Sequence, residues 1–265
     1  MVFEGQGLHT AARAVVEILA RPGPFVLHKD GIDVTRADLD VIDSMRSTTV
    51  ASSTGAARLA TVEHLFAALG GLGIHDGIVV DVRGPELPLL DGAAAAWCRA
   101  LRALGAPRSA ARLAIAKEAS ITVGASSYAF VPGDDVGVEV HVDFDDERLA
   151  KTAAWHGDAD DFAARIATAR TFGFEHEVDD LIARGLASHV SPEAVVVIGR
   201  DRVLCAGAPF TSDEPARHKL LDLVGDLWVH GGPPRGLVRA TRPGHAATHT
   251  AMAQALARGI VVASA

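Results

Sequence analysis

Three polar residues recur at one-turn intervals within an apolar part of the chain. His218, Asp222 and Asp226 stand at positions i, i+4 and i+8 of a segment with helical patterning, so a helix would place them along one face. An imidazole and a carboxylate one turn apart can converge on a single metal ion. A solvated acidic face with a surface histidine is the alternative. Apolar neighbours favour burial instead, and buried carboxylates need a partner; these neighbours are Leu220, Leu221, Leu223, Val224 and Leu227.

A third metal ligand would come from elsewhere in the chain, and His64 is the best candidate. It follows Glu63 in an apolar segment whose pattern predicts a short helix over about 60–69, with Thr61 as the N-cap. Adjacent helix positions point about 100° apart, so one side chain can bind a metal while the other faces the water that the metal activates. A carboxylate in that position is the usual general base of metal hydrolases. For His64 taken alone, a core histidine beside a chance acid is the alternative.

Two further residues are candidates for the remaining steps of an amide hydrolysis. His245 follows Arg-Pro-Gly in a predicted loop before the last helix. If it faces the same metal, it can protonate a leaving amine while Asp226 holds its ring. Thr171 is a candidate donor to the developing oxyanion. Taken singly, the histidine would be a surface residue, and a threonine at a helix-to-turn junction would be a cap.

The elements that must position these residues alternate between helices and strands. Strand patterns cover 78–82, 120–123, 137–144 and 194–198, and helical patterns cover about 91–104, 159–169, 178–184, 213–229 and 246–257. A Gly-Ala-Pro-Arg stretch within 105–111 predicts a boundary between two domains, 1–108 and 112–265. Segments 63–77 and 217–232 are faintly alike, each running from a charged residue and a histidine through an apolar helix to glycine. This echo fits two similarly built α+β units with chemistry at their seam.

The composition excludes several classes of protein. The chain has 265 residues, 49% of them hydrophobic, which is enough for one large domain or two small ones. A formal charge of -8 argues against non-specific binding to nucleic acid. The two distant cysteines indicate neither a disulfide framework nor a thiolate metal site. Without a signal-peptide pattern or an apolar run of roughly 20 residues, the sequence predicts a soluble, cytoplasmic protein with no stable membrane insertion.

Separated segments of the chain resemble, in the same order, the signature segments of the UDP-3-O-acyl-N-acetylglucosamine deacetylases, zinc-dependent enzymes of lipid A biosynthesis. The segments are ATVEHLFAAL with GLGI, PELPLLDGAA, ARTFGFEHEV, DEPARHKLLDLVGDL and PGHA, and GQGLHT at 5–10 resembles the family's opening motif. The resemblance spans about residues 5–256. It implies an α+β fold of two structurally related domains, each a sheet with helices, stacked as a β-α-α-β sandwich with the active site at the domain seam.

The resemblance also implies a metal centre and its catalytic groups. His64, His218 and Asp222 would hold Zn²⁺, although two imidazoles and a carboxylate would suit Fe²⁺ as well. Glu63 would activate water, and His245 would be the acid or electrostatic stabiliser. The substrate would be a small-molecule nucleotide sugar that carries a 3-O-acyl chain, and the reaction would release acetate.

The remaining candidates receive roles around the substrate from the same resemblance. Asp226 would orient the catalytic imidazole, and Thr171 would contact the carbonyl oxygen of the amide. Lys219 would face the nucleotide phosphate, while Phe172 and Phe174 would line the substrate cleft.

The sequence departs from the family in segments that face the substrate, while the metal and catalytic groups are unchanged. Residues 187–194 read ASHVSPEA where the family has small glycines along the acyl channel, so His189 and Val190 predict a narrower channel and a shorter acyl group. GIHD at 73–76 replaces GIDN, and RPGHAATHT lacks a Lys-Ser pair and later Asn residues. Two alternatives follow: a divergent paralogue with the same zinc amidase chemistry on another N-acyl amino sugar, and a non-catalytic metal- or ligand-binding homologue. The sequence does not predict the oligomeric state.

Overall fold

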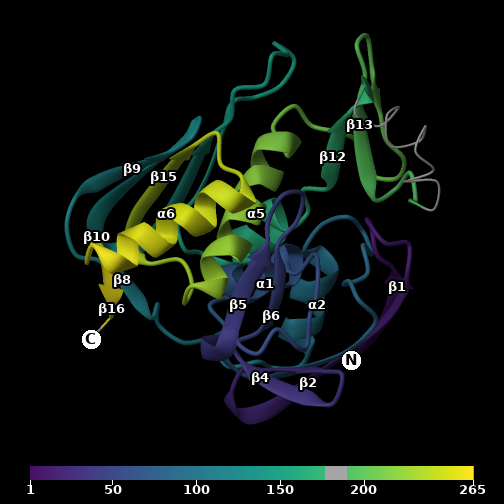
Figure 1. Cartoon of the computed structure of the whole chain (residues 1–265). Coiled ribbons are helices and arrows are strands. Elements are labelled where there is room, and N and C mark those ends of the chain that lie inside the picture. Colours follow the sequence, from purple (N-terminus) through teal and green to yellow (C-terminus); the bar gives the residue numbers. More distant parts are fainter. Residues whose placement is uncertain (177–189, 265) are drawn as a thin grey trace.

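Two β-sheets lie on either side of a group of helices in the computed structural model (Figure 1). The structure describes residues 1–176 and 190–264. The predicted α+β class is confirmed, because separate multi-stranded sheets pack against helices rather than alternating with them in one parallel sheet. Among the described residues, no helix is both long and apolar enough to cross a membrane.

The N-terminal sheet has five strands in the order β1-β2-β7-β3-β4. These strands are β1 (Val2–Gln6), β2 (Arg13–Pro24), β3 (Val26–Lys29), β4 (Ile32–Thr35) and β7 (Asp76–Arg83). Ala14, Val16 and Ile18 on β2 are fully buried, because alternate residues of a strand point to one face and this face packs on the helices. β3 and β7 are parallel, while the other neighbouring pairs are antiparallel.

The C-terminal sheet has six strands, with β11-β10-β15-β8-β16 in order and β9 paired to β10. Its strands are β8 (Leu113–Ile115), β9 (Ala119–Val123), β10 (Ser126–His141), β11 (Thr152–Trp155), β15 (Arg235–Thr241) and β16 (Val261–Ala263). The pattern at 137–144 covers only the later part of β10, since a change of register between Val131 and Val136 interrupts the alternation. The strands of the two large sheets fall on opposite sides of 105–111; the division into two domains stays a prediction.

Helices fill the space between the sheets (Figure 1). They are α1 (Glu63–Leu72), α2 (Ala95–Ala103), α3 (Ala159–Asp161) with a π-helical turn (Phe162–Ile166), α5 (Glu214–Val229) and α6 (His245–Ala257). The two echoed segments supply α1 and α5, which pack directly on each other. A β-carbon at Gly225 would overlap the carbonyl oxygen of Glu63, so glycine permits this close approach of the two helices. The helix predicted over 178–184 lies outside the described residues.

Two expected helix starts were wrong. Thr61 is not an N-cap: its φ is +58° and its hydroxyl donates a hydrogen bond to Glu86 over 2.8 Å, and α1 begins only at Glu63. The helix predicted to begin at Asp91 begins only at Ala95, although the Asp91 carboxylate accepts hydrogen bonds from the backbone of Ala93 and of Ala96 in the first turn of α2.

Two small sheets complete the fold. β5 (Leu39–Asp43) pairs with β6 (Thr49–Ser52), and β12 (Thr171–Phe174) pairs with β13 (Val195–Ile198), which also pairs with β14 (Val203–Leu204). A short 3-10 turn, η1 (Arg36–Asp38), precedes β5. The strand predicted at 194–198 is therefore confirmed.

An aromatic cluster forms the centre of the core where α1 and α5 pack on each other. The ring of Trp228 on α5 lies 4.5 Å from that of Phe66 on α1 and 4.8 Å from that of Phe25, measured between centroids. Its indole N–H donates a hydrogen bond to the carbonyl of Ile74 over 2.9 Å. All three rings are almost fully buried, so α1 and α5 are held in a fixed relation to each other.

Candidate metal centre and active site

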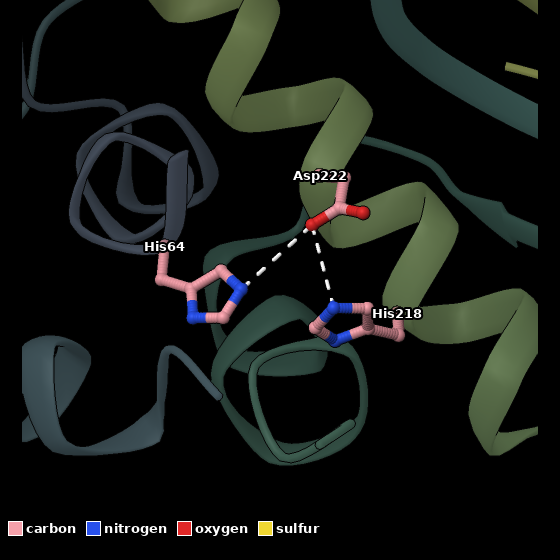
Figure 2. A group of neighbouring side chains, drawn as sticks. All are labelled: His64, His218 and Asp222. Atoms are coloured by element: carbon pink, nitrogen blue, oxygen red, sulfur yellow. Dashed lines mark ion pairs between the residues drawn. The ribbon is translucent and has the colours of Figure 1, made fainter. Parts of the chain in front are cut away.

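His64, His218 and Asp222 lie together where α1 meets α5. Figure 2 shows His64 reaching from one helix towards the two residues one turn apart on the other. The Asp222 Oδ1 atom is 3.5 Å from His218 Nε2 and 3.8 Å from His64 Nε2, and the ligand atoms all lie within 4.8 Å of one another. Ligands at about 2.0 Å from a tetrahedral zinc ion are about 3.3 Å apart. The three donors are therefore close to the separation that one ion requires.

The protonation of these residues also fits a divalent metal. The His218 Nδ1–H donates to the carbonyl of Ala169 over 3.0 Å, which leaves the Nε2 lone pair for a ligand bond. Burial lowers the pKa of His218 and, with the nearby His218 imidazole, lowers the pKa of His64 to about 3. Both rings are thus neutral, as metal binding demands.

Asp222 is the anionic member of the set and is 6% exposed. Burial by itself would raise its pKa, but the Lys219 ammonium and the His218 ring hold the pKa well below its usual range. The Lys219 Nζ donates to the outer oxygen, Oδ2, over 2.9 Å, so Oδ1 faces the two imidazoles. The predicted role of Lys219 towards a nucleotide phosphate stays a prediction; in the structure it binds the carboxylate of Asp222.

Glu63 is the first residue of α1 and lies beside the metal-ligand set, 4% exposed. Its Oε2 accepts a hydrogen bond from the backbone N–H of Thr48 over 3.0 Å. Burial raises the pKa of Glu63 to about 7, with His245 opposing this rise and Asp222 adding to it. A carboxylate with a pKa near neutrality is suited to accept a proton from water and to release it again.

His245 faces the same site and pairs with Asp226. It is the first residue of α6, not part of the preceding loop as predicted. Its Nδ1 lies 2.9 Å and 3.1 Å from the two oxygens of Asp226, which is 1% exposed. Burial alone would lower the pKa of His245, but the charge and hydrogen bond of Asp226 outweigh burial and raise it to about 10. His245 is therefore an imidazolium at neutral pH.

Thr48 contacts both Glu63 and Asp226, and the sequence analysis did not predict it as a site residue. Its backbone N–H binds Glu63, and its hydroxyl donates to Asp226 Oδ1 over 2.6 Å. The residue is fully buried and directly precedes β6. A lone threonine between β5 and β6 carries no motif, so only the packed structure reveals it.

Three of the residues predicted to face the substrate, Thr171, Phe172 and Phe174, lie on β12, whereas Lys219 lies on α5. Thr171 begins this strand rather than ending a helix, and its hydroxyl donates to the carbonyl of Gly92 over 3.0 Å. A hydroxyl has one hydrogen, so contact with an oxyanion would require this bond to break; that role stays a prediction. The Phe172 ring lies 5.9 Å from the His218 ring and 5.5 Å from that of Phe144.

The aromatic side chains lead away from the metal ligands towards a cavity. The Phe174 ring is 5.8 Å from that of Phe144, and both line a cavity of about 730 Å³ together with Ile198, His176 and polar residues of the 143–148 segment. A series of aromatic rings therefore connects the site on the β12 side with a cavity whose remaining lining is mostly polar or charged.

Comparison with known proteins decides the family. The family model described as UDP-3-O-acyl N-acetylglycosamine deacetylase matches residues 1–258. Two proteins named UDP-3-O-acyl-N-acetylglucosamine deacetylase, from Brucella melitensis biotype 2 and Brucella ovis, are each 34% identical over 254 residues, which is 92% of this chain and 88% of theirs. The chain belongs to this deacetylase family. The predicted family and the predicted enzyme class, an amide hydrolase, are confirmed.

One departure from the deacetylase pattern, at 73–76, lies in the core. His75, which replaces the family's aspartate, is 3% exposed and packs against Gly232. In the altered channel segment, Val190 is half-buried, whereas His189 lies outside the described residues. The narrowed channel of this deacetylase stays a prediction.

Proposed function

We propose that this chain removes the N-acetyl group of a UDP-3-O-acyl-N-acetylglucosamine, a reaction of lipid A biosynthesis, and that His64, His218 and Asp222 hold one zinc ion for it. The observation that carries the proposal is the buried cluster of three ligand atoms beside a carboxylate with a raised pKa. The names of the relatives support the substrate. In the reaction water replaces the amine at the acetyl carbon, so that a C–N bond breaks, a C–O bond forms, and acetate and a free amine leave.

Two residues of the chain carry out the proton transfers: Glu63 accepts a proton from water, and His245 donates one to the departing amine. When bound, the metal supplies Lewis acidity, which lowers the pKa of water and polarises a carbonyl group. Glu63 accepts the proton of the attacking water, since its pKa of about 7 keeps a large fraction of it ionised at neutral pH. His245, held as a cation by Asp226, stabilises the negative charge that develops on the carbonyl oxygen and gives its proton to the departing amine.

The surroundings of the site support a substrate with an apolar chain. Phe172 touches the ring of a metal ligand, and Phe174 lines the neighbouring cavity. We propose that the 3-O-acyl chain follows these rings, because burying each methylene contributes about 0.8 kcal/mol. Lys219, whose Nζ lies 5.9 Å from the centroid of the Phe172 ring, stands beside these rings, and we propose that the nucleotide phosphate lies within its reach.

Mass spectrometry of reactions with UDP-3-O-acyl-N-acetylglucosamines of several chain lengths tests the function. Loss of one acetyl group is expected for at least one of them. Metal-loaded protein that leaves every substrate intact would contradict the proposal and favour a paralogue with another amide substrate, or a homologue without turnover. Elemental analysis of the same protein distinguishes zinc, which is expected, from iron.

A further inference from the structure

Two histidines that the proposed mechanism does not use extend inward from Asp226. His249 lies one helical turn after His245 on α6 and is 8% exposed. Its Nε2 atom is 3.3 Å from Asp226 Oδ1 and 3.0 Å from the Thr48 hydroxyl oxygen. Its other ring nitrogen, Nδ1, is 2.9 Å from Nε2 of His230, the residue that ends α5. The pair formed by His245 and Asp226 is therefore extended by a series of hydrogen-bonded polar side chains that lead to His230.

With Asp226 ionised and His249 as a neutral ring, the hydrogen count fixes the direction of every bond in this series. The single hydroxyl hydrogen of Thr48 points to Asp226, 2.6 Å away, so the Thr48 oxygen must accept from His249 Nε2–H. The His249 Nδ1 is then an acceptor, and His230 Nε2–H donates to it. Burial lowers the pKa of His230 to about 4, so this ring is neutral. All donors in the series point towards the Asp226 carboxylate.

Asp226 is consequently held by three donors from two parts of the chain, two from α6 and one from the residue that precedes β6. His245 binds both oxygens, while Thr48 and His249 share Oδ1. A carboxylate that is 1% exposed has little access to bulk water that would replace a lost donor. The plane of the carboxylate, and with it the direction of the His245 ring, depends on these contacts.

We infer that His249 is a positioning residue for deacetylation: its Nε2–H, kept in that tautomer by His230, fixes the Asp226 carboxylate that orients His245. This inference rests on the roles proposed for Asp226 and His245. An asparagine amide offers an N–H donor as well. His249→Asn is therefore the conservative variant.

A double-mutant cycle on the metal-loaded enzyme tests the inference. The variants are His249→Ala, His249→Asn, Asp226→Asn and the double variant His249→Ala with Asp226→Asn. His249→Ala should lower kcat by about tenfold or more with KM and metal content little changed, as loss of a hydrogen bond to a charged group would. His249→Asn should restore most of the rate. The double variant should be no slower than Asp226→Asn alone, because His249 acts only through that carboxylate.

Thr250→Ala, at the next and exposed position of α6, is the matched control and should keep the parental rate. His249→Ala at the parental rate, or losses that add in the double variant, would overturn the inference alone. Parental rates for Asp226→Asn would refute the proposed catalytic roles and this inference together. If His249→Ala does not fold, NMR of ¹⁵N-labelled histidine in the parent still decides, since a His249 ring with hydrogen on Nδ1 and none on Nε2 contradicts the assignment.

Discussion

The hydroxyl of Thr48 offers a sharp test of the site, because one atom can be removed while the backbone contact to Glu63 remains. In Thr48→Val the donor to Asp226 disappears, although the side chain keeps its shape. A hydrogen bond to a charged group contributes about 1.5–3 kcal/mol, and this one is short, at 2.6 Å, and fully buried. The free energy of unfolding should therefore fall by about that amount.

Activity should fall as well, since the lost bond helps to hold the carboxylate that orients His245. If the loss of 1.5–3 kcal/mol raises the activation free energy in full, kcat/KM drops by about ten- to a hundredfold. Thr48→Ser is the matched control, because it keeps the hydroxyl and loses one methyl group, which costs about 1 kcal/mol of stability. Urea unfolding and deacetylation rates of both variants decide. A valine variant as active and as stable as the serine variant would refute the reasoning.

Other expectations concern the metal, the base, the acid and the substrate path. The parent should bind one divalent metal ion per chain, and His218→Ala should lose it while the exposed His156→Ala retains it; equal metal content in both would contradict the ligand assignment. Glu63→Gln should keep the metal and lose about a hundred- to ten-thousandfold in kcat, measured by acetate release. The free energy of unfolding should fall between pH 6.5 and about 10, by up to about 1.4 kcal/mol per pH unit, because only the folded state keeps His245 protonated there; His245→Gln should lack this fall. Phe172→Ala should raise KM more for long than for short 3-O-acyl chains, and an equal rise for both would place the acyl chain elsewhere.

The part of the site that follows from local spacing was predictable. His218 and Asp222 converge because a helix brings positions i and i+4 together whatever surrounds it, and the apolar neighbours indicated that this helix is buried. His64 and Glu63 are adjacent in sequence, so one prediction carried both. The echo between the segments that became α1 and α5 indicated where they would meet.

Other parts depend on contacts that no local pattern encodes. Thr48 and Asp226 are 178 positions apart, and their contact exists only after α1, α5 and the β5-β6 pair have packed. Thr61 has a favourable N-cap side chain, but its hydroxyl is bound to the buried carboxylate of Glu86 and its backbone is left-handed. Tertiary bonding outweighed local preference there. The strand β10 was predicted short because its register change breaks the alternation on which strand prediction relies.

The proposed metal ligands come from helices that belong to opposite halves of the sequence, with His64 on α1 and the other two on α5. An ion bound by both helices acts as a removable crosslink between segments more than 150 residues apart. Binding to the folded state alone stabilises it by about 2.7 kcal/mol when the free ion is at a hundred times its dissociation constant. If the proposed ion binds there, metal supply sets not only the chemistry of this chain but also how firmly its two halves are joined, and a cell short of the ion would hold a less stable protein as well as a less active one.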